Sequence, residues 1–329
     1  MVSNRLVWSK AQQTLAAQAN KSVSFILKTT KSVNFVDIDM LWTLFDHMVL
    51  PILTYGSQIW GCDTAKCVEQ VQNKFCKFLL KLPNQAVNVA VRGECGRLPI
   101  KVTATLNVLK YWCKLVCMDN NILPKSCNKM IYALDLNGRV TWATKVKHLM
   151  YNSGFGIVWL SQEIGNVSLF LIEAKQRLID IAHQEWHSDL NQCSKLQTLC
   201  EFKSLLNPER YLSHVTIVKH RISLSRLRLS VHNLAIETGR HINIDPELRT
   251  CKYCNSTGEN LIEDEFHFVL ICPLYKIIRL KLIANNIVTY PSTENFVNLF
   301  SSKDPVVLKG LAKYVFEAFK LRDNVFVNL

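Results

Sequence analysis

Glycine and proline are scarce in this chain, with 11 and 9 among 329 residues. That scarcity excludes a disordered or linker-like composition, because such segments are enriched in both residues. Long apolar runs are also missing. The longest, MVLPILTYGSQIW (48–60), contains Pro51 and is too short to cross a bilayer. The start, MVSNRLVWSKAQQTLAAQ, has no continuous apolar segment of the signal-peptide kind. We therefore expect no membrane span and an intracellular protein, in the nucleus, the cytoplasm or both.

Common enzyme motifs are absent as well. The chain contains no phosphate-binding G-x-x-x-x-G-K-[ST] loop, no G-x-S-x-G elbow and no G-x-G-x-x-G turn. The segment HQEWH (183–187) places His183 and His187 on one helical face, as in H-E-x-x-H metalloproteases. In that motif the glutamate directly follows the first histidine. Here Glu185 is two residues after His183, about 200° round the helix, and points away from it. We interpret this segment as a solvated helix face.

What the chain has in excess is positive charge. Lysine and arginine number 39 against 26 acidic residues, which gives a formal charge of +13 and a pI of about 9.2. Such an excess favours a polyanionic partner, with a basic but merely solvated surface as the alternative. The 12 cysteines of an intracellular chain indicate metal binding where their spacing fits, and small core residues elsewhere.

Apolar residues recur every three or four positions along nearly the whole chain, and strand-like alternation is scarce. The fold class that this periodicity predicts is mainly α, with helical bundle segments and a small C-terminal zinc knuckle. The expected helices are Arg5–Thr29, Val36–Leu50, Ala65–Leu82, Val102–Met118, Trp142–Tyr151, Leu169–Leu190, Lys195–Leu206, Val215–Ile236 and Leu308–Leu321.

A metal-ligand pattern lies near the C-terminus. The segment CKYCNSTGENLIEDEFHFVLICP (251–273) has the frame C-x2-C-x12-H-x4-C, which offers Cys251, Cys254, His267 and Cys272 as ligands. Structural zinc takes four tetrahedral ligands of these types. We expect Asp264 to cap a short helix that carries His267, and Pro273 to begin the next helix. Four protein ligands leave no position for water, so the expected zinc is structural. The alternative is that His267 and Cys272 are core residues and only the first two cysteines look paired.

Two basic segments are candidates for phosphate contacts. Between residues 210 and 236 there is no acidic side chain, and a helix over 65–82 carries a lysine stripe. Basic side chains spaced along one helical face can follow a phosphate backbone, although the lysine stripe fits a solvated face equally well. The candidate nucleic-acid-binding residues are Arg210, Lys219, Arg221, Arg226, Arg228, Lys74, Lys77 and Lys81.

Three blocks of the chain resemble the C-terminal part of the reverse transcriptase protein of non-LTR (LINE-like) retrotransposons. They are LFDHMVLPILTYGSQIWG (44–61), VQNKFCKFLLKLPNQAVNVAVRGECGRLPI (71–100) and LRLSVHNLAIETGRHINIDPELRTCKYCNSTGENLIEDEFHFVLICPLYKIIR (227–279). The resemblance implies that the four Cys and His residues are the ligands of a CCHC zinc knuckle. In that family the knuckle is associated with nucleic-acid binding during target-primed reverse transcription.

The resemblance also implies a division of the chain. Residues 1–62 would be thumb-like helices after a missing palm, 63–206 a helical linker, 207–285 the basic segment with the knuckle, and 286–329 C-terminal helices. Polymerases of this family hold two metal ions with paired aspartates. This chain contains no Asp-Asp dipeptide. We therefore expect a truncated or separately encoded tail, not an enzyme.

The expected function is that of a nucleic-acid-binding portion of a transposable-element protein, with RNA or DNA as partner. A separate polymerase-containing element protein would be a second partner. One alternative is a reverse transcriptase, named from its family. Another is an inactive element remnant that serves protein contacts.

Overall fold

The computed structural model describes residues 7–31 and 37–326. Within these ranges the chain is built from helices, and its only β pairing is an isolated antiparallel bridge between Thr250 and Ile262. The expectation of a mainly α fold is confirmed. The starts of two expected helices, at Arg5 and Val36, lie outside the described residues. No described helix is both long enough and apolar enough to cross a membrane.

The chain forms two compact units, each made of two segments. Unit 1 comprises residues 1–75 and 98–185, and unit 2 comprises residues 76–97 and 186–329. This division differs from the four consecutive parts expected from the sequence, because a short segment (76–97) leaves its sequence neighbours and joins the C-terminal half. Two of the three boundaries between the units fall inside helices, α5 (Lys66–Leu79) and α11 (Val167–Asn191), and the third, at 97/98, falls between helices.

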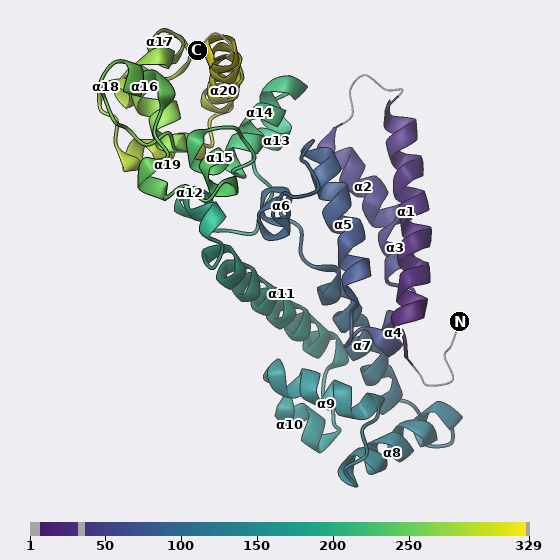
Figure 1. Cartoon of the computed structure of the whole chain (residues 1–329). Helices are drawn as coiled ribbons and strands as arrows, with labels where there is room; N and C mark the ends of the chain where they lie inside the picture. The colour runs from purple at the N-terminus through teal and green to yellow at the C-terminus, as the bar shows by residue number, and fades with distance from the viewer. Residues whose placement is uncertain (1–6, 32–36, 327–329) are drawn as a thin grey trace. The chain divides into compact units, whose positions relative to one another are not determined.

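Unit 1 is an assembly of helices (Figure 1). They pack around two groups of buried side chains. Besides α5 and α11, its helices are α1 (Ser9–Lys31), α2 (Ile38–Met48), α3 (Leu50–Leu53), α4 (Ser57–Trp60), α7 (Ile100–Val116), α8 (Leu123–Leu136), α9 (Trp142–Asn152) and α10 (Gly156–Ser161). The first group is a triangle of aromatic rings from α2 and α5. The ring centre of Phe75 lies 4.8 Å from that of Phe45 and 5.1 Å from that of Trp42.

The second group joins α7, α9 and α11. Val108, Val146 and Leu178, one from each of these helices, belong to a single buried apolar cluster. Further along the unit, α4 packs closely against α7. Glycine is required there, because a Cβ atom at Gly61 would overlap the carbonyl oxygen of Ala104. These contacts fix the start of α7 against its neighbours.

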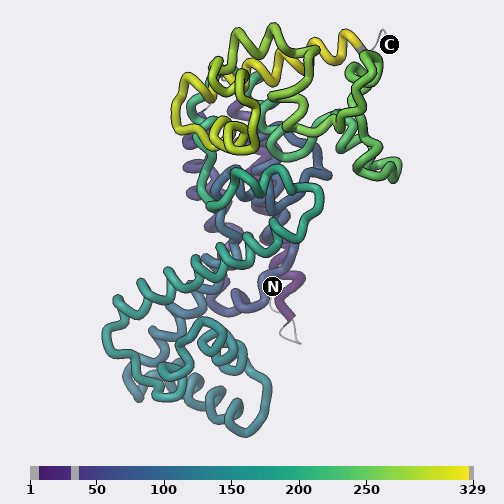
Figure 2. Tube along the Cα trace, turned by 90° about the vertical axis from the view of Figure 1, so that its left-hand side faces the viewer, coloured from purple at the N-terminus to yellow at the C-terminus, as the bar shows by residue number. Residues whose placement is uncertain are grey.

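Unit 2 is organised around its last helix, α20 (Pro305–Phe326), which packs against α14 and α17 (Figure 1 and Figure 2). Its other helices are α6 (Asn88–Cys95), η1 (Ser194–Leu196), α12 (Gln197–Phe202), α13 (Tyr211–His214), α14 (Val218–Arg228), α15 (Ala235–His241), η2 (Pro246–Leu248), α16 (Lys252–Ser256), η3 (His267–Ile271), η4 (Pro273–Tyr275), α17 (Lys276–Leu282), α18 (Asn285–Thr289) and α19 (Thr293–Phe300).

The prediction of a single helix over Val215–Ile236 is wrong. The segment forms two helices, α14 and α15, because Ser230 between them adopts a left-handed backbone conformation with φ of 51°. The Ser230 hydroxyl donates a hydrogen bond to Glu265, 3.2 Å away, and the side chain is buried. This tertiary hydrogen bond stabilises a turn that the apolar periodicity of the segment does not show.

A buried ion-pair network ties α6 to α14. The Arg228 guanidinium lies 3.0 Å from a carboxylate oxygen of Glu94 and 2.8 Å from one of Glu209, and it donates to the Phe300 carbonyl at 2.8 Å. Burial raises the pKa of Glu94. The neighbouring carboxylates Glu94 and Glu209 raise the pKa of Arg228 against the opposing effect of its own burial.

We expect the substitution Arg228→Met to destabilise unit 2 by about 3–5 kcal/mol, because it leaves Glu94 buried without its partner. Arg226→Met, on the same helix but at an exposed position, should change stability by less than about 1 kcal/mol. Urea unfolding followed by circular dichroism would measure both. Equal, small effects would contradict a structural role for the network.

Candidate metal centre

The four ligands expected from the sequence converge in unit 2. One ligand atom from each of Cys251, Cys254, His267 and Cys272 lies within 4.8 Å of every other, and all four residues are buried. We call this group the metal cluster. Its members span 22 positions of the chain, and local structure brings them together.

The first two ligands sit at the start of a short helix. Cys251 caps α16, and Cys254 lies within it. The Cys251 backbone N–H donates to the Leu261 carbonyl at 2.8 Å, on one side of the bridge between Thr250 and Ile262. Gly258, at φ of 90°, lies in the turn between these paired segments. The paired backbone therefore holds the cysteine pair beside the segment that leads to His267.

The third ligand is positioned by a helix cap and an unusual turn. The Asp264 carboxylate accepts the His267 backbone N–H at 2.7 Å, which confirms the expected cap. Burial raises the pKa of Asp264. From His267 to Ile271 the backbone forms a π-helical turn, closed by the Cys272 N–H donating to the His267 carbonyl at 2.8 Å. Such turns are rare in proteins, and those that occur are often found at functional sites.

The fourth ligand, Cys272, lies just before Pro273, which begins η4 as expected. Two side chains hold the carbonyls of this turn. Arg279, buried on α17, donates to the carbonyls of Val269 at 2.7 Å and Cys272 at 2.9 Å. Tyr314, on α20, donates to the Phe268 carbonyl at 2.7 Å. The orientation of the ligands therefore depends on contacts from two other helices.

Two of the distances between ligand atoms agree with tetrahedral coordination. The Cys254 sulfur lies 3.5 Å from His267 Nε2 and 3.9 Å from the Cys272 sulfur. Metal–sulfur bonds of about 2.3 Å and metal–nitrogen bonds of about 2.0–2.1 Å at tetrahedral angles require roughly 3.5 Å and 3.8 Å for these two separations. The cluster can therefore hold a metal ion with little movement of its side chains.

The thiols of the cluster share protons in a dry environment. A hydrogen bond from Cys272 lowers the pKa of the Cys251 thiol to about 3 and raises that of Cys272 itself. Burial raises the pKa of the Cys254 thiol to about 11. A cation bound to all three thiolates would take the place of these protons.

The structure separates the candidate phosphate-binding residues into exposed and buried ones. Arg210, Lys219, Arg226, Lys74 and Lys81 are exposed. Arg221 is half-buried and donates to the carbonyls of Leu212 and Val215.

For two candidates the placement corrects the expectation. Arg228 lies in the buried ion pairs described above, and Lys77 is buried with its ammonium donating to the Asn84 carbonyl at 2.6 Å. Burial also lowers the pKa of Lys77. Neither side chain can reach a phosphate without leaving these partners. A helical stripe in the sequence does not reveal which of its cations an adjoining segment covers.

Four of the exposed cations in unit 2 lie around one cleft. Arg226 on α14 and Lys320 on α20 line a cavity of about 540 Å³ together with Phe316 and Phe319. The Lys219 ammonium lies 4.7 Å from the centre of the Phe316 ring, and Arg226 donates to the carbonyl of Lys81 at 3.4 Å. We call this the basic cleft. Lys320 was not a candidate from the sequence, because only the packing of α20 on α14 brings it there.

The basic cleft shares a wall with the metal cluster. Phe319, which lines the cleft, stacks on Phe268 at 4.5 Å, and Phe268 follows the ligand His267. His232, also in the lining, lies 2.9 Å from the carboxylate of Glu265, next to the capping residue Asp264. Glu263 forms a buried ion pair with Arg322 of α20 at 2.8 Å. Residues next to the metal cluster therefore contact residues that line the cleft.

No protein-family model, no curated protein and no solved structure matches this chain.

We expect the purified chain to contain about one tightly bound metal ion, and Cys272→Ser to lose it, because three ligands in a buried site leave one coordination position unsatisfied. Loss of about 3 kcal/mol of linked stability would lower the unfolding midpoint of unit 2 by roughly 6–12 °C. Elemental analysis and a thermal melt measure both effects. Cys127→Ser, at an exposed cysteine on α8, is the matched control. Metal content that is equal in the two variants would exclude the cluster as the binding site.

Proposed function

We propose that this chain binds nucleic acid, RNA or DNA, through the basic cleft, and that a structural zinc ion in the metal cluster holds the cleft in shape. In this proposal the chain corresponds to the C-terminal portion of a non-LTR retrotransposon reverse transcriptase protein and works beside a separate polymerase-containing protein. The observation that carries the proposal is the wall, built on Phe268 and Phe319, that the metal cluster and the basic cleft share.

Zinc is the metal that the ligand set favours. Three thiolates and one imidazole form a soft donor set, and zinc prefers tetrahedral sites of this composition. The four ligands are 0–4% exposed, so four protein atoms fill the coordination sphere in a place that water does not reach. A metal in this environment supports the fold and has no open position at which to activate a substrate.

Nucleic acid is the partner that the charges of the cleft favour. Lys81, Lys219, Arg226 and Lys320 are exposed cations from three separate parts of unit 2, and each lies in the cleft or contacts a residue that does. Asp323 is the one carboxylate in the lining, and it accepts a hydrogen bond from Asn233 at 3.2 Å. Exposed lysine and arginine side chains that contact phosphates neutralise them and release their counterions.

Salt dependence tests the cleft. The double substitution Arg226→Gln/Lys320→Gln should reduce the slope of log affinity for nucleic acid against log salt concentration by about 1.4–1.8. Each lost phosphate contact accounts for about 0.7 on single strands and about 0.9 on duplex. Lys276→Gln/Lys281→Gln removes the same charge from exposed positions of α17, which do not line the cleft, and should leave the slope unchanged.

Fluorescence anisotropy with labelled oligonucleotides at several salt concentrations measures both slopes. Equal flattening in the two double variants would mean that only net charge matters, and the cleft would then have no special role. Arg221 and Arg228 are unsuitable for this test, since their partners lie within the fold.

The proposal also makes a prediction about chemistry. Nucleotide transfer by polymerases of this kind uses two metal ions held by paired aspartates, and the sequence contains no Asp-Asp dipeptide. We therefore expect the purified chain, with magnesium, a primed template and all four nucleotides, to extend no primer above a no-enzyme control. Gel analysis of a labelled primer would show any extension, and extension that persists through purification to homogeneity would make the chain an enzyme.

A further inference from the structure

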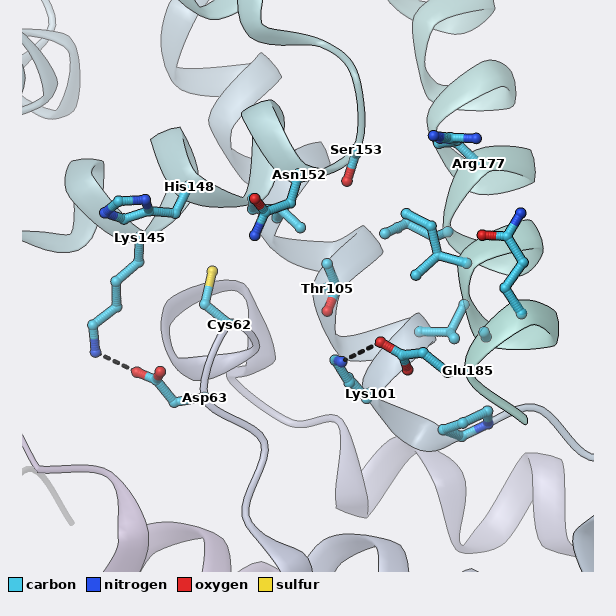
Figure 3. A pocket seen from close by; sticks show the side chains of 17 residues that line it. Cys62, Asp63, Lys101, Thr105, Lys145, His148, Asn152, Ser153, Arg177 and Glu185 are labelled. Atoms are coloured by element: carbon cyan, nitrogen blue, oxygen red, sulfur yellow. Dashed lines mark hydrogen bonds and ion pairs between the residues drawn. The ribbon is translucent and has the colours of Figure 1, made fainter. Parts of the chain in front are cut away.

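Unit 1 contains a second polar cleft, far in sequence from the metal cluster. Its volume is about 550 Å³, and its lining comes from the loop after α4, the start of α7, the end of α9 and the later turns of α11 (Figure 3). Leu178 of α11 belongs both to this lining and to the buried cluster that joins α7, α9 and α11. The walls are therefore fixed by a common core, which is what a preformed ligand site requires.

The cleft has more cationic than anionic side chains. On one side Lys145 forms an ion pair with Asp63, and on another Lys101 lies 3.4 Å from the carboxylate of Glu185 (Figure 3). These side chains are 42–57% exposed, and exposed pairs contribute at most about 1 kcal/mol, so both lysines can turn toward a stronger anion. Arg177 on α11 also lines the cleft and forms no ion pair with any described residue.

The remaining lining offers two more kinds of contact. Val102, Leu149, Leu178 and Ile181 are apolar and can cover the face of a flat ring. Asn152 and Gln184 line the cleft too, and their side-chain amides make no hydrogen bond to the part of the chain that the structure describes. Such amides can donate to and accept from the edge of a nucleobase.

We infer that this cleft binds a nucleoside 5′-phosphate, with Arg177 on the phosphate and the base on the apolar side chains. The planar guanidinium fork matches a phosphate in two parallel hydrogen bonds, and Lys101 and Lys145, elsewhere in the lining, add positive charge to the cleft, which favours a dianion over a carboxylate. The volume lies in the range of small-molecule sites, about 300–1,000 Å³. The ligand is either a free mononucleotide or the terminal nucleotide of a strand. The inference does not depend on the proposed function, because all of its residues belong to unit 1.

Isothermal titration of the full chain with adenosine 5′-monophosphate tests this site. We expect measurable binding, with adenosine alone and inorganic phosphate alone at least tenfold weaker, because each supplies only half of the contacts. Arg177→Gln should weaken the binding of the monophosphate at least tenfold. Lys175→Gln, an exposed cation on the same helix that does not line the cleft, should stay within twofold of the unmodified chain.

The outcomes separate clearly. No binding of the monophosphate, or equal losses in the two variants with unchanged circular dichroism, would overturn the inference. A 5′-phosphorylated tetranucleotide that competes in an Arg177-dependent way would assign the terminal nucleotide of a strand, and failure to compete would assign the free nucleotide. Arg226→Gln/Lys320→Gln should leave the affinity for the monophosphate within twofold, so failure of the basic cleft and failure of this site are distinguishable.

Discussion

The constraint on which unit 2 depends is the confinement of three thiols and one imidazole in a space without water. Groups of this kind repel one another once the thiols ionise, and burial opposes each charge separately. A cation coordinated by all four would remove both penalties at once and would link the bridge at Thr250, the helix α16 and the π-helical turn. Because an unfolded chain has no preformed site, the free energy of binding such a cation would also be free energy of folding.

Several charged side chains around the metal cluster are buried too, and each of these has a polar partner. Buried charged groups near the metal cluster are paired, as Glu263 is with Arg322, or donate to backbone carbonyls, as Arg279 does. Such groups stabilise a fold only when every partner is present. Tyr314 and Arg322 of α20 hold segments next to the metal cluster, and Lys320 of the same helix lines the basic cleft. One helix therefore both stabilises the surroundings of the cluster and supplies positive charge to the cleft.

The sequence alone predicts the metal cluster well and the basic face poorly, for a physical reason. Ligand spacing, the Asp264 cap and the Pro273 start are local features, and a local feature survives in any fold that contains the segment. Whether Arg228 is exposed depends on Glu94, which is 134 residues away, and no periodicity in α14 reports that partner. The turn at Ser230 was missed on the same grounds, since its hydrogen bond reaches Glu265. The long helix α11 lies within two residues of its expected bounds, whereas α20 begins three residues before and ends five residues after the expected Leu308–Leu321.

The π-helical turn has a consequence for the spacing of ligands. In an α-helix, residues five apart point about 140° away from one another, so His267 and Cys272 could not both face one ion. A turn closed between residues five apart winds less per residue and brings the two ends of the segment back to the same side. The ligand spacing is thus matched to the winding of the backbone more than to the side chains between the ligands. Inserting one residue into 268–271 would separate the two ligands by six positions, about 120° apart in α-helical winding, and would turn the cysteine away from an ion even if every ligand remained.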